Sequence, residues 1–127
     1  MVKLRFSMEG AGFAATIDFC SYRDALEEFG RALYEFPRSS TDEVVSENGS
    51  SAANSYSRLV LRAFVFDSVG HSALEVECQR NGTRLVSARS RFAVELEPAT
   101  LNWLGLGLAS WASRVSELSF VFDSDER

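Results

Sequence analysis

One histidine and two cysteines are the side chains of this 127-residue sequence with the most capacity for chemistry at neutral pH. His71 follows Asp67 by four residues, a spacing at which a carboxylate can orient an imidazole as a general base. Cys20 directly precedes a predicted helix, where the helix dipole and free N–H groups lower a thiol pKa. One hypothesis is therefore a Cys20 nucleophile with a His71 base, oriented by Asp67.

The same residues also have structural interpretations, which we favour. Residues 67–71, Asp-Ser-Val-Gly-His, have the composition of a turn in which Asp accepts backbone hydrogen bonds and Gly supplies a positive φ. Cys20 stands at the expected inward end of a strand, and Cys78 shares a predicted inward face with Val76. Because free cysteines are among the most buried residue types, we expect both thiols in the core and no catalytic residue.

The sequence predicts no metal, no cofactor and no nucleic acid partner. One histidine and two distant cysteines do not supply the closely spaced ligands that zinc prefers. Gly105-Leu106-Gly107 lacks the third glycine and the flanking βαβ unit of a dinucleotide site. The formal charge of −5, from 18 acidic and 13 basic residues, disfavours binding to phosphate backbones. An acidic surface suits a basic protein partner instead.

The sequence shows no targeting or membrane segment. Residues 1–6 have no apolar core of signal-peptide length, and the uncharged stretch 98–113 is too short to span a bilayer. We therefore expect a cytoplasmic protein without membrane contact, in which both thiols are reduced.

Hydrophobic periodicity predicts a hairpin and a helix in the first part of the chain. Alternation over 2–6 and 13–19 indicates two strands joined by a turn at 8–12. Ser21 is expected to cap a helix that ends before Pro37, with Gly30 allowing close approach to the sheet. Its apolar stripe has a 3.6-residue period: Tyr22, Leu26, Phe29, Leu33 and Phe36. The polar segment 38–54 is predicted to be a flexible loop or lid.

The remaining segments complete a predicted α+β domain that spans 1–127. Strands are expected at 58–67, 72–79 and 84–95, with a tight hairpin turn at Asn81-Gly82. A second helix is expected from Pro98 to Ser113, and a closing strand at 117–123. The prediction is an antiparallel sheet of about five or six strands, in the order ββαβββαβ, with the helices on one face.

The segment 98–113 carries the strongest interaction signal. It contains no charged residue, and Trp103, Leu106 and Trp111 cannot all face the same side of one helix. Two interpretations remain open: the sheet and the long loop cover this helix, or a partner protein or a second copy does. Tryptophan is enriched where interface energy is concentrated, so these three are the predicted interaction residues.

The pattern Asp67-x-x-Gly70-His71-x-x-Leu74-x-Val76, together with the layout of elements, resembles small uncharacterised bacterial α+β families. Some of these layouts are shared with immunity proteins that block a cognate toxin. The resemblance implies a non-enzymatic bacterial domain that binds a protein partner.

Three functional hypotheses follow. The leading one is an immunity-like protein-interaction domain that binds a protein partner or a second copy of itself. The first alternative is a small thiol-dependent enzyme that uses Cys20 and His71. The second is a small-molecule-binding module, with its site between the sheet and the 38–54 segment.

Overall fold

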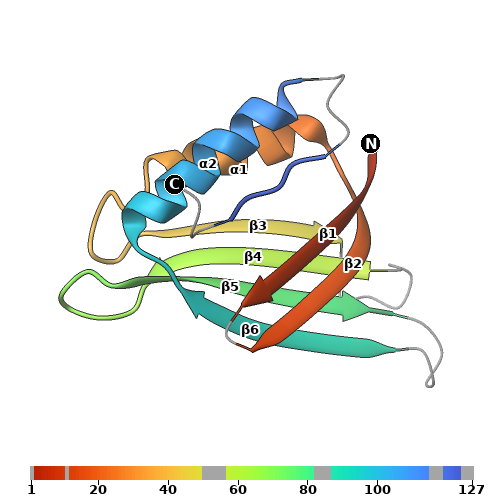
Figure 1. Ribbon diagram of the computed structural model, residues 1–127, viewed down its shortest axis with the longest axis horizontal. Helices are drawn as coiled ribbons and strands as arrows, with labels where there is room; N and C mark the ends of the chain where they lie inside the picture. The colour runs from red at the N-terminus through yellow and green to blue at the C-terminus, as the bar shows by residue number, and fades with distance from the viewer. Residues whose placement is uncertain (1, 11, 50–56, 82–86, 115–118, 124–127) are drawn as a thin grey trace.

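The computed structural model describes residues 2–10, 12–49, 57–81, 87–114 and 119–123. Within them the chain forms six strands and two helices (Figure 1). In chain order these are β1 (Val2–Gly10), β2 (Phe13–Ser21), α1 (Arg23–Tyr34), β3 (Glu43–Gly49), β4 (Ser57–Val65), β5 (Ser72–Arg80), β6 (Ala88–Glu95) and α2 (Pro98–Ala112).

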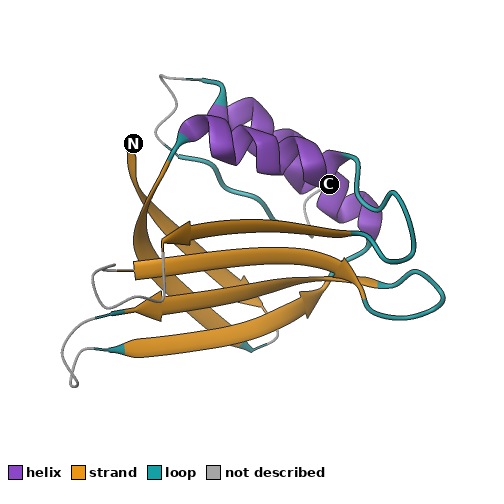
Figure 2. Cartoon of the chain, turned by 180° about the vertical axis from the view of Figure 1, so that it is seen from behind, coloured by secondary structure: helices purple, strands orange, loops and turns teal. Residues whose placement is uncertain are grey.

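The strands form two antiparallel sheets. β1 pairs with β2 in a hairpin, and the other strands form a sheet in the order β3-β4-β5-β6. Both helices lie over one face of the four-stranded sheet, and the hairpin crosses its strands obliquely (Figures 1 and 2). The α+β class, the antiparallel pairing, the total of six strands and the placement of both helices on one face confirm the prediction, but the strands form two sheets where one was expected.

The core lies on the inner face of the four-stranded sheet, which the two helices cover at one end and the β1–β2 hairpin covers at the other. At one end the helices contribute Phe29, Leu33 and Leu101, which pack against Ala63 and Leu74. At the other end the hairpin places Ile17 and Phe19 against three inward side chains of β4 and β5, which are Leu59, Val76 and Cys78. Every second residue of these strands therefore faces apolar side chains, as the period of a half-buried strand requires.

The outer face of the same sheet carries alternating charges. The Arg58 guanidinium lies 2.9 Å from Glu47 Oε1 through Nη2 and 3.1 Å from Glu77 Oε1 through Nη1. Arg62 Nη1 lies 3.1 Å from Glu43 Oε2. We call the eight side chains of this face the sheet ion-pair network: Glu43, Glu47, Arg58, Arg62, Glu75, Glu77, Arg89 and Arg91. Opposite charges facing each other across strands stabilise the pairing.

The predicted flexible loop at 38–54 is wrong in its central part, because residues 43–49 form β3. This strand pairs with β4 in the register Val44↔Ala63 and Asn48↔Leu59. Val44 and Asn48 are both buried. The sequence of this segment lacks a strand pattern because only one of these two inward positions is apolar. The segment is nevertheless a strand, because hydrogen bonds to β4 satisfy its backbone N–H and C=O groups. Residues 50–54 lie outside the described part of the chain.

The expected closing strand at 117–123 is also wrong where the structure describes it. Residues 119–123 form no strand and run along α2 instead (Figure 1). Residues 117 and 118 lie outside the described residues, as does Gly82 of the predicted hairpin turn. The helix predicted from Pro98 is confirmed as α2.

The start of α1 and the hairpin turn differ from the prediction. Ser21 is not the helix cap: it ends β2, and its buried hydroxyl donates to Asn48 Oδ1 at 2.6 Å. Tyr22 is the N-cap and, within the described residues, makes no side-chain capping bond. The strands of the hairpin extend to Gly10 and Phe13, so the turn is shorter than the expected 8–12.

Candidate functional site

Cys20 and His71 lie at opposite ends of the four-stranded sheet. Cys20 is near the start of β4, where the Ser57 hydroxyl donates to the Asp18 carbonyl at 2.6 Å. His71 precedes β5, beside the other end of β4 at Val65. With a rise of about 3.3 Å per residue, the length of β4 separates the two ends by ~26 Å. The structure therefore does not support a nucleophile and base pair made of Cys20 and His71.

His71 and Asp67 belong to one turn between β4 and β5, as the structural interpretation expects. Asp67 Oδ1 accepts hydrogen bonds from the N–H groups of Val69 at 3.1 Å and His71 at 2.9 Å. Asp67 Oδ2 lies 2.5 Å from His71 Nδ1. Gly70 has a φ of 89°, in the region that favours glycine. The carboxylate thus closes a turn and holds the imidazole against it.

The contact between Asp67 and His71 raises the pKa of the imidazole and lowers that of the carboxyl. The hydrogen bond and the charge of Asp67 raise the pKa of the His71 imidazole above its ordinary value. Desolvation acts to raise the pKa of the Asp67 carboxyl, but the backbone and imidazole hydrogen bonds outweigh it and lower the pKa. Each shift favours the ion pair. The imidazole is 59% exposed, so this pair lies at the surface and lines neither of the hollows described below.

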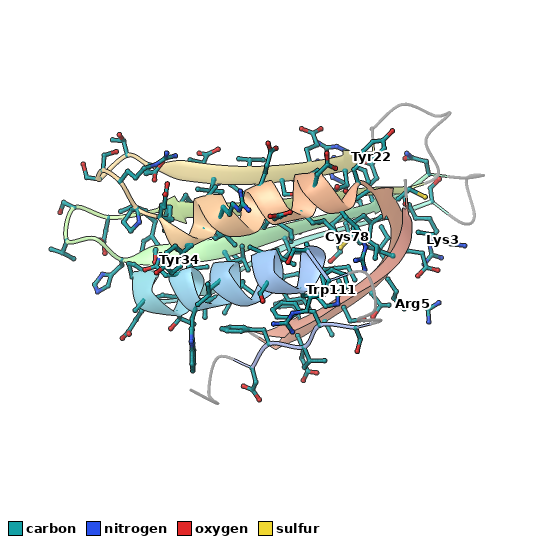
Figure 3. The ribbon with its side chains drawn as sticks, turned by 90° about the horizontal axis from the view of Figure 1, so that it is seen from above. Lys3, Arg5, Tyr22, Tyr34, Cys78 and Trp111 are labelled. Carbon is teal, nitrogen blue, oxygen red and sulfur yellow. The ribbon has the colours of Figure 1, made fainter. Side chains whose placement is uncertain are left out.

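The two thiols have different environments. Cys20 is exposed, so its predicted core position is wrong: the alternation of β2 turns it away from the buried Phe19 and Ser21. Cys78 is buried under the hairpin, as expected (Figure 3). Burial, and then the charge of Glu77, raise the pKa of the Cys78 thiol. Cys78 is therefore held in its unreactive protonated form.

The three predicted interaction residues are covered to different extents. Trp111 stacks on Phe120 with ring centroids 6.2 Å apart, and the Arg23 guanidinium lies 5.5 Å from its ring centroid. Trp103 has an edge-to-face contact with Phe122 at 6.4 Å and is still 40% exposed. Leu106 is 50% exposed. The chain itself therefore covers Trp111 but leaves Trp103 and Leu106 partly open.

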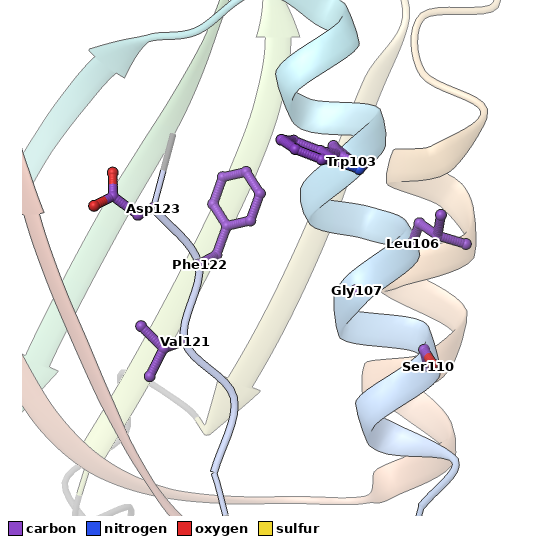
Figure 4. Close-up of a pocket in the computed structure, with 7 residues that line it drawn as sticks. All are labelled: Trp103, Leu106, Gly107, Ser110, Val121, Phe122 and Asp123. Atoms are coloured by element: carbon purple, nitrogen blue, oxygen red, sulfur yellow. The ribbon is translucent and has the colours of Figure 1, made fainter. Parts of the chain in front are cut away.

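A groove of about 500 Å³ lies between α2 and the C-terminal segment (Figure 4). Its lining comprises Trp103, Leu106, Gly107, Ser110, Val121, Phe122 and Asp123. A smaller hollow of about 260 Å³ lies between the two helices, and Leu106 and Ser110 line both. Tyr34, at the end of α1, borders the smaller hollow and is 55% exposed (Figure 3).

We call the aromatic and aliphatic side chains around these hollows the helix-layer patch: Tyr34, Trp103, Leu106, Val121 and Phe122. Sequence reasoning identified Trp103 and Leu106 but missed the other three. Phe122 was assigned to a closing strand, and Tyr34 lies outside the apolar stripe of α1. The only signal for Val121, which is 87% exposed, was its position between two phenylalanines.

The charge around the helix-layer patch is negative. α1 and its C-cap carry four acidic residues and two basic ones, and α2 carries no charge, so the helix layer has a formal charge of −2. Asp123 adds a carboxylate at the groove. Glu27 forms an ion pair with Arg31 beside the smaller hollow.

The fold defines this chain as an α+β domain in which two helices and a hairpin share one face of a four-stranded antiparallel sheet. Comparison with protein-family models, with curated proteins and with solved structures finds no match. Among the described residues, no group of three or more His, Cys, Asp or Glu side chains could hold a metal ion. In that same part of the chain, neither helix has the length and apolar character needed to cross a membrane.

Proposed function

We propose that this chain is a non-enzymatic protein-binding domain that contacts its partner through the helix-layer patch. The observation that carries the proposal is the grouping of large, exposed apolar side chains around Leu106, next to a groove of about 500 Å³. Contiguous exposed apolar surface marks interaction sites in monomeric proteins. Tryptophan and tyrosine, both present here, often dominate the binding free energy.

The charges around the patch indicate the chemistry of the partner. The helix layer has a formal charge of −2, and the whole chain has −5. The best complement is an apolar side chain that enters the groove, surrounded by lysine or arginine. Such opposite potentials accelerate association and exclude acidic competitors.

A narrower part of the proposal concerns the biological role. The resemblance in layout to bacterial immunity proteins supports a cytoplasmic domain that binds a cognate toxin and blocks it. Inhibition of this kind needs only tight coverage of the toxin surface, and it requires no catalytic residue.

Site-specific photocrosslinking tests where the partner binds. A benzophenone amino acid at Leu106 is expected to crosslink a basic partner protein when the two are coexpressed. The matched control is the same amino acid at Val45, which is 47% exposed on β3. A Trp103→Glu substitution should abolish crosslinking at position 106. Equal crosslinking at both positions, or none at 106, would contradict the proposal.

The small-molecule alternative is tested in parallel. Residues 43–49, expected to be part of a lid over its site, form β3 of the sheet itself, and Val44 packs into the helix-side core. The groove is the remaining candidate, and its volume lies within the usual range of ligand sites. If a compound library raises Tm, if Leu106→Asp removes the effect, and if no protein crosslinks at 106, then the patch is a ligand site and the proposal fails.

A further inference from the structure

Among the described residues, β6 is an edge strand of the four-stranded sheet that no other strand pairs with on its outer side. The sheet order β3-β4-β5-β6 makes β3 and β6 its two edge strands. β3 packs against α1 and β2, whereas β6 has β5 as its main neighbour. The first four residues of β6, 88–91, are all exposed. An uncovered edge strand offers a row of N–H and C=O groups to another strand.

The hydrogen-bond pattern shows which backbone groups face outward. The Leu96 N–H donates to the Ser72 carbonyl at 3.1 Å and so continues the ladder between β6 and β5. Antiparallel ladders alternate, so the even-numbered residues of β6 bond to β5. The N–H and C=O groups of Arg89, Arg91, Ala93 and Glu95 therefore point away from the sheet, at its free edge.

We propose that two copies of this chain pair antiparallel through β6, with a two-fold axis at Phe92, and join their sheets into one continuous sheet. In this register Arg89 of each copy faces Glu95 of the other, and Arg91 faces Ala93. Both ends of the contact thus bring opposite charges together, which favours the pairing of two strands. The charges of β6 are arranged for this, with its arginines in the first half and Glu95 at its end.

Charge disfavours one neighbouring register and aromatic packing disfavours the other. An axis one residue earlier would place Arg91 opposite itself, and like charges directly opposite destabilise strand pairs. An axis one residue later, at Ala93, would also bring opposite charges together, as Arg91 with Glu95, but it would place Phe92 opposite Val94, so aromatic packing and not charge favours the axis at Phe92. Phe13, at the hairpin tip, is 63% exposed and stacks on Phe92 with ring centroids 6.1 Å apart. In the proposed register the two Phe92 residues are directly opposite, with Cα atoms about 4.5 Å apart.

The aromatic rings give this contact an apolar centre. Pairing at Phe92 brings the exposed Phe13 rings of both copies to the two-fold axis, where they lose water contact. Burying apolar surface is the main favourable contribution to most association. The contact uses β6 and the hairpin tip, whereas the helix-layer patch lies on other elements, so the two proposals are independent.

A charge exchange tests the pairing. Sedimentation velocity over a concentration series is expected to show a dimer for the unmodified chain. Arg89→Glu and Glu95→Arg should each raise the dimer dissociation constant roughly tenfold or more, because each places like charges opposite. An equimolar mixture of the two variants should form a heterodimer, visible by native mass spectrometry, because both facing pairs are again opposite in charge. The control is Arg5→Glu, the same charge change on β1.

A backbone variant tests the same contact without a change of charge. Ala93→Pro removes an outward N–H, which bonds no residue of β5, and edge strands accept proline. It is expected to be a folded monomer with an unfolding transition like that of the unmodified chain. A monomeric unmodified chain at its highest soluble concentration would overturn the proposal. A dimer that survives Ala93→Pro, or a mixture that stays monomeric, would overturn it as well.

Discussion

Gly30 of α1 and Gly105 of α2 lie against each other's helix backbone, with no room for a methyl group at either position. A Cβ on Gly30 would lie 2.7 Å from the carbonyl oxygen of Gly105 and 2.6 Å from the amide nitrogen of Ala109. A Cβ on Gly105 would lie 2.6 Å from the amide nitrogen of Tyr34. Gly30 therefore permits close approach to α2, and the expected close approach to the sheet is wrong. The close contact of the two helices sets the position of the helix-layer patch.

The first prediction concerns this helix contact. Gly30→Ala should lower the free energy of unfolding by about 1–3 kcal/mol, because overpacking outweighs the gain of about 1 kcal/mol in helix propensity. Gly107→Ala, in α2, is the control, because its Cβ would meet only the edge of the Phe120 ring at 2.9 Å, and a side chain can move. Urea denaturation measures both. A Gly30→Ala variant as stable as the unmodified chain would contradict the close contact.

The second prediction concerns the buried hydrogen bond between Ser21 and Asn48. Both residues are buried, and the Ser21 hydroxyl donates to Asn48 Oδ1 at 2.6 Å. Ser21→Ala leaves that oxygen without its donor, which should cost about 1–3 kcal/mol of unfolding free energy. Ser7→Ala is the control, because its bond to Thr16 is exposed, and its effect should be close to zero. An equal loss of unfolding free energy in Ser21→Ala and Ser7→Ala, measured by chemical denaturation, would contradict a larger contribution from the buried hydrogen bond.

The third prediction concerns pH. Since the folded pKa of His71 is raised, the pair stabilises the fold fully below the unfolded value of about 6.5, and this contribution is lost as pH rises through the folded value. The Asp67 pKa is lowered, so its contribution is present above about 3.9 and is lost as pH falls through the folded value. An NMR titration should therefore give His71 a pKa above 6.5.

Asp67→Asn provides the matched test of this pair. It keeps a side chain that can bond the backbone of the turn but removes the negative charge, so the His71 pKa should fall toward its ordinary value. Identical titration curves for the two proteins would mean that the carboxylate does not hold the imidazole.

The fourth prediction separates the two thiols. Iodoacetamide should modify Cys20 in the folded protein, because that side chain is exposed. Cys78 should react only after unfolding in guanidinium chloride, because it is buried and its pKa is raised. Peptide mass spectrometry at increasing times distinguishes the two sites. Early modification of Cys78 would show that the hairpin does not cover the inner face of β5.

Elements with a complete local pattern could be predicted from the sequence. In α1 the apolar residues Leu26, Phe29 and Leu33 recur with the helical period, and all three are buried. In β5 the predicted inward residues Leu74, Val76 and Cys78 are buried, and Ser72 and Ala73 at the start of the strand are buried as well. Such patterns are predictive because each element buries one face of its own.

β3 and the C-terminal segment depend on distant partners, so local patterns were misleading there. Asn48 faces inward on β3 because its side chain bonds Ser21 and reaches the Leu59 carbonyl at 3.5 Å, and no nearby residue signals this. Phe120 and Phe122 alternate as in a strand, yet both pack against tryptophans of α2. The same segment decides which residues of α2 stay open, so only Trp103 and Leu106 of the patch could be anticipated.

The sheet ion-pair network makes the two sides of the domain electrically unequal. It contains four arginines and four glutamates, so 14 of the 18 acidic and nine of the 13 basic residues lie elsewhere. The whole excess of −5 therefore resides outside the network. A cationic protein at long range experiences a torque as well as an attraction, because the field is asymmetric. Within the described residues the helix layer carries −2, so the field of the domain favours approach of such a protein from the helix side over the neutral network.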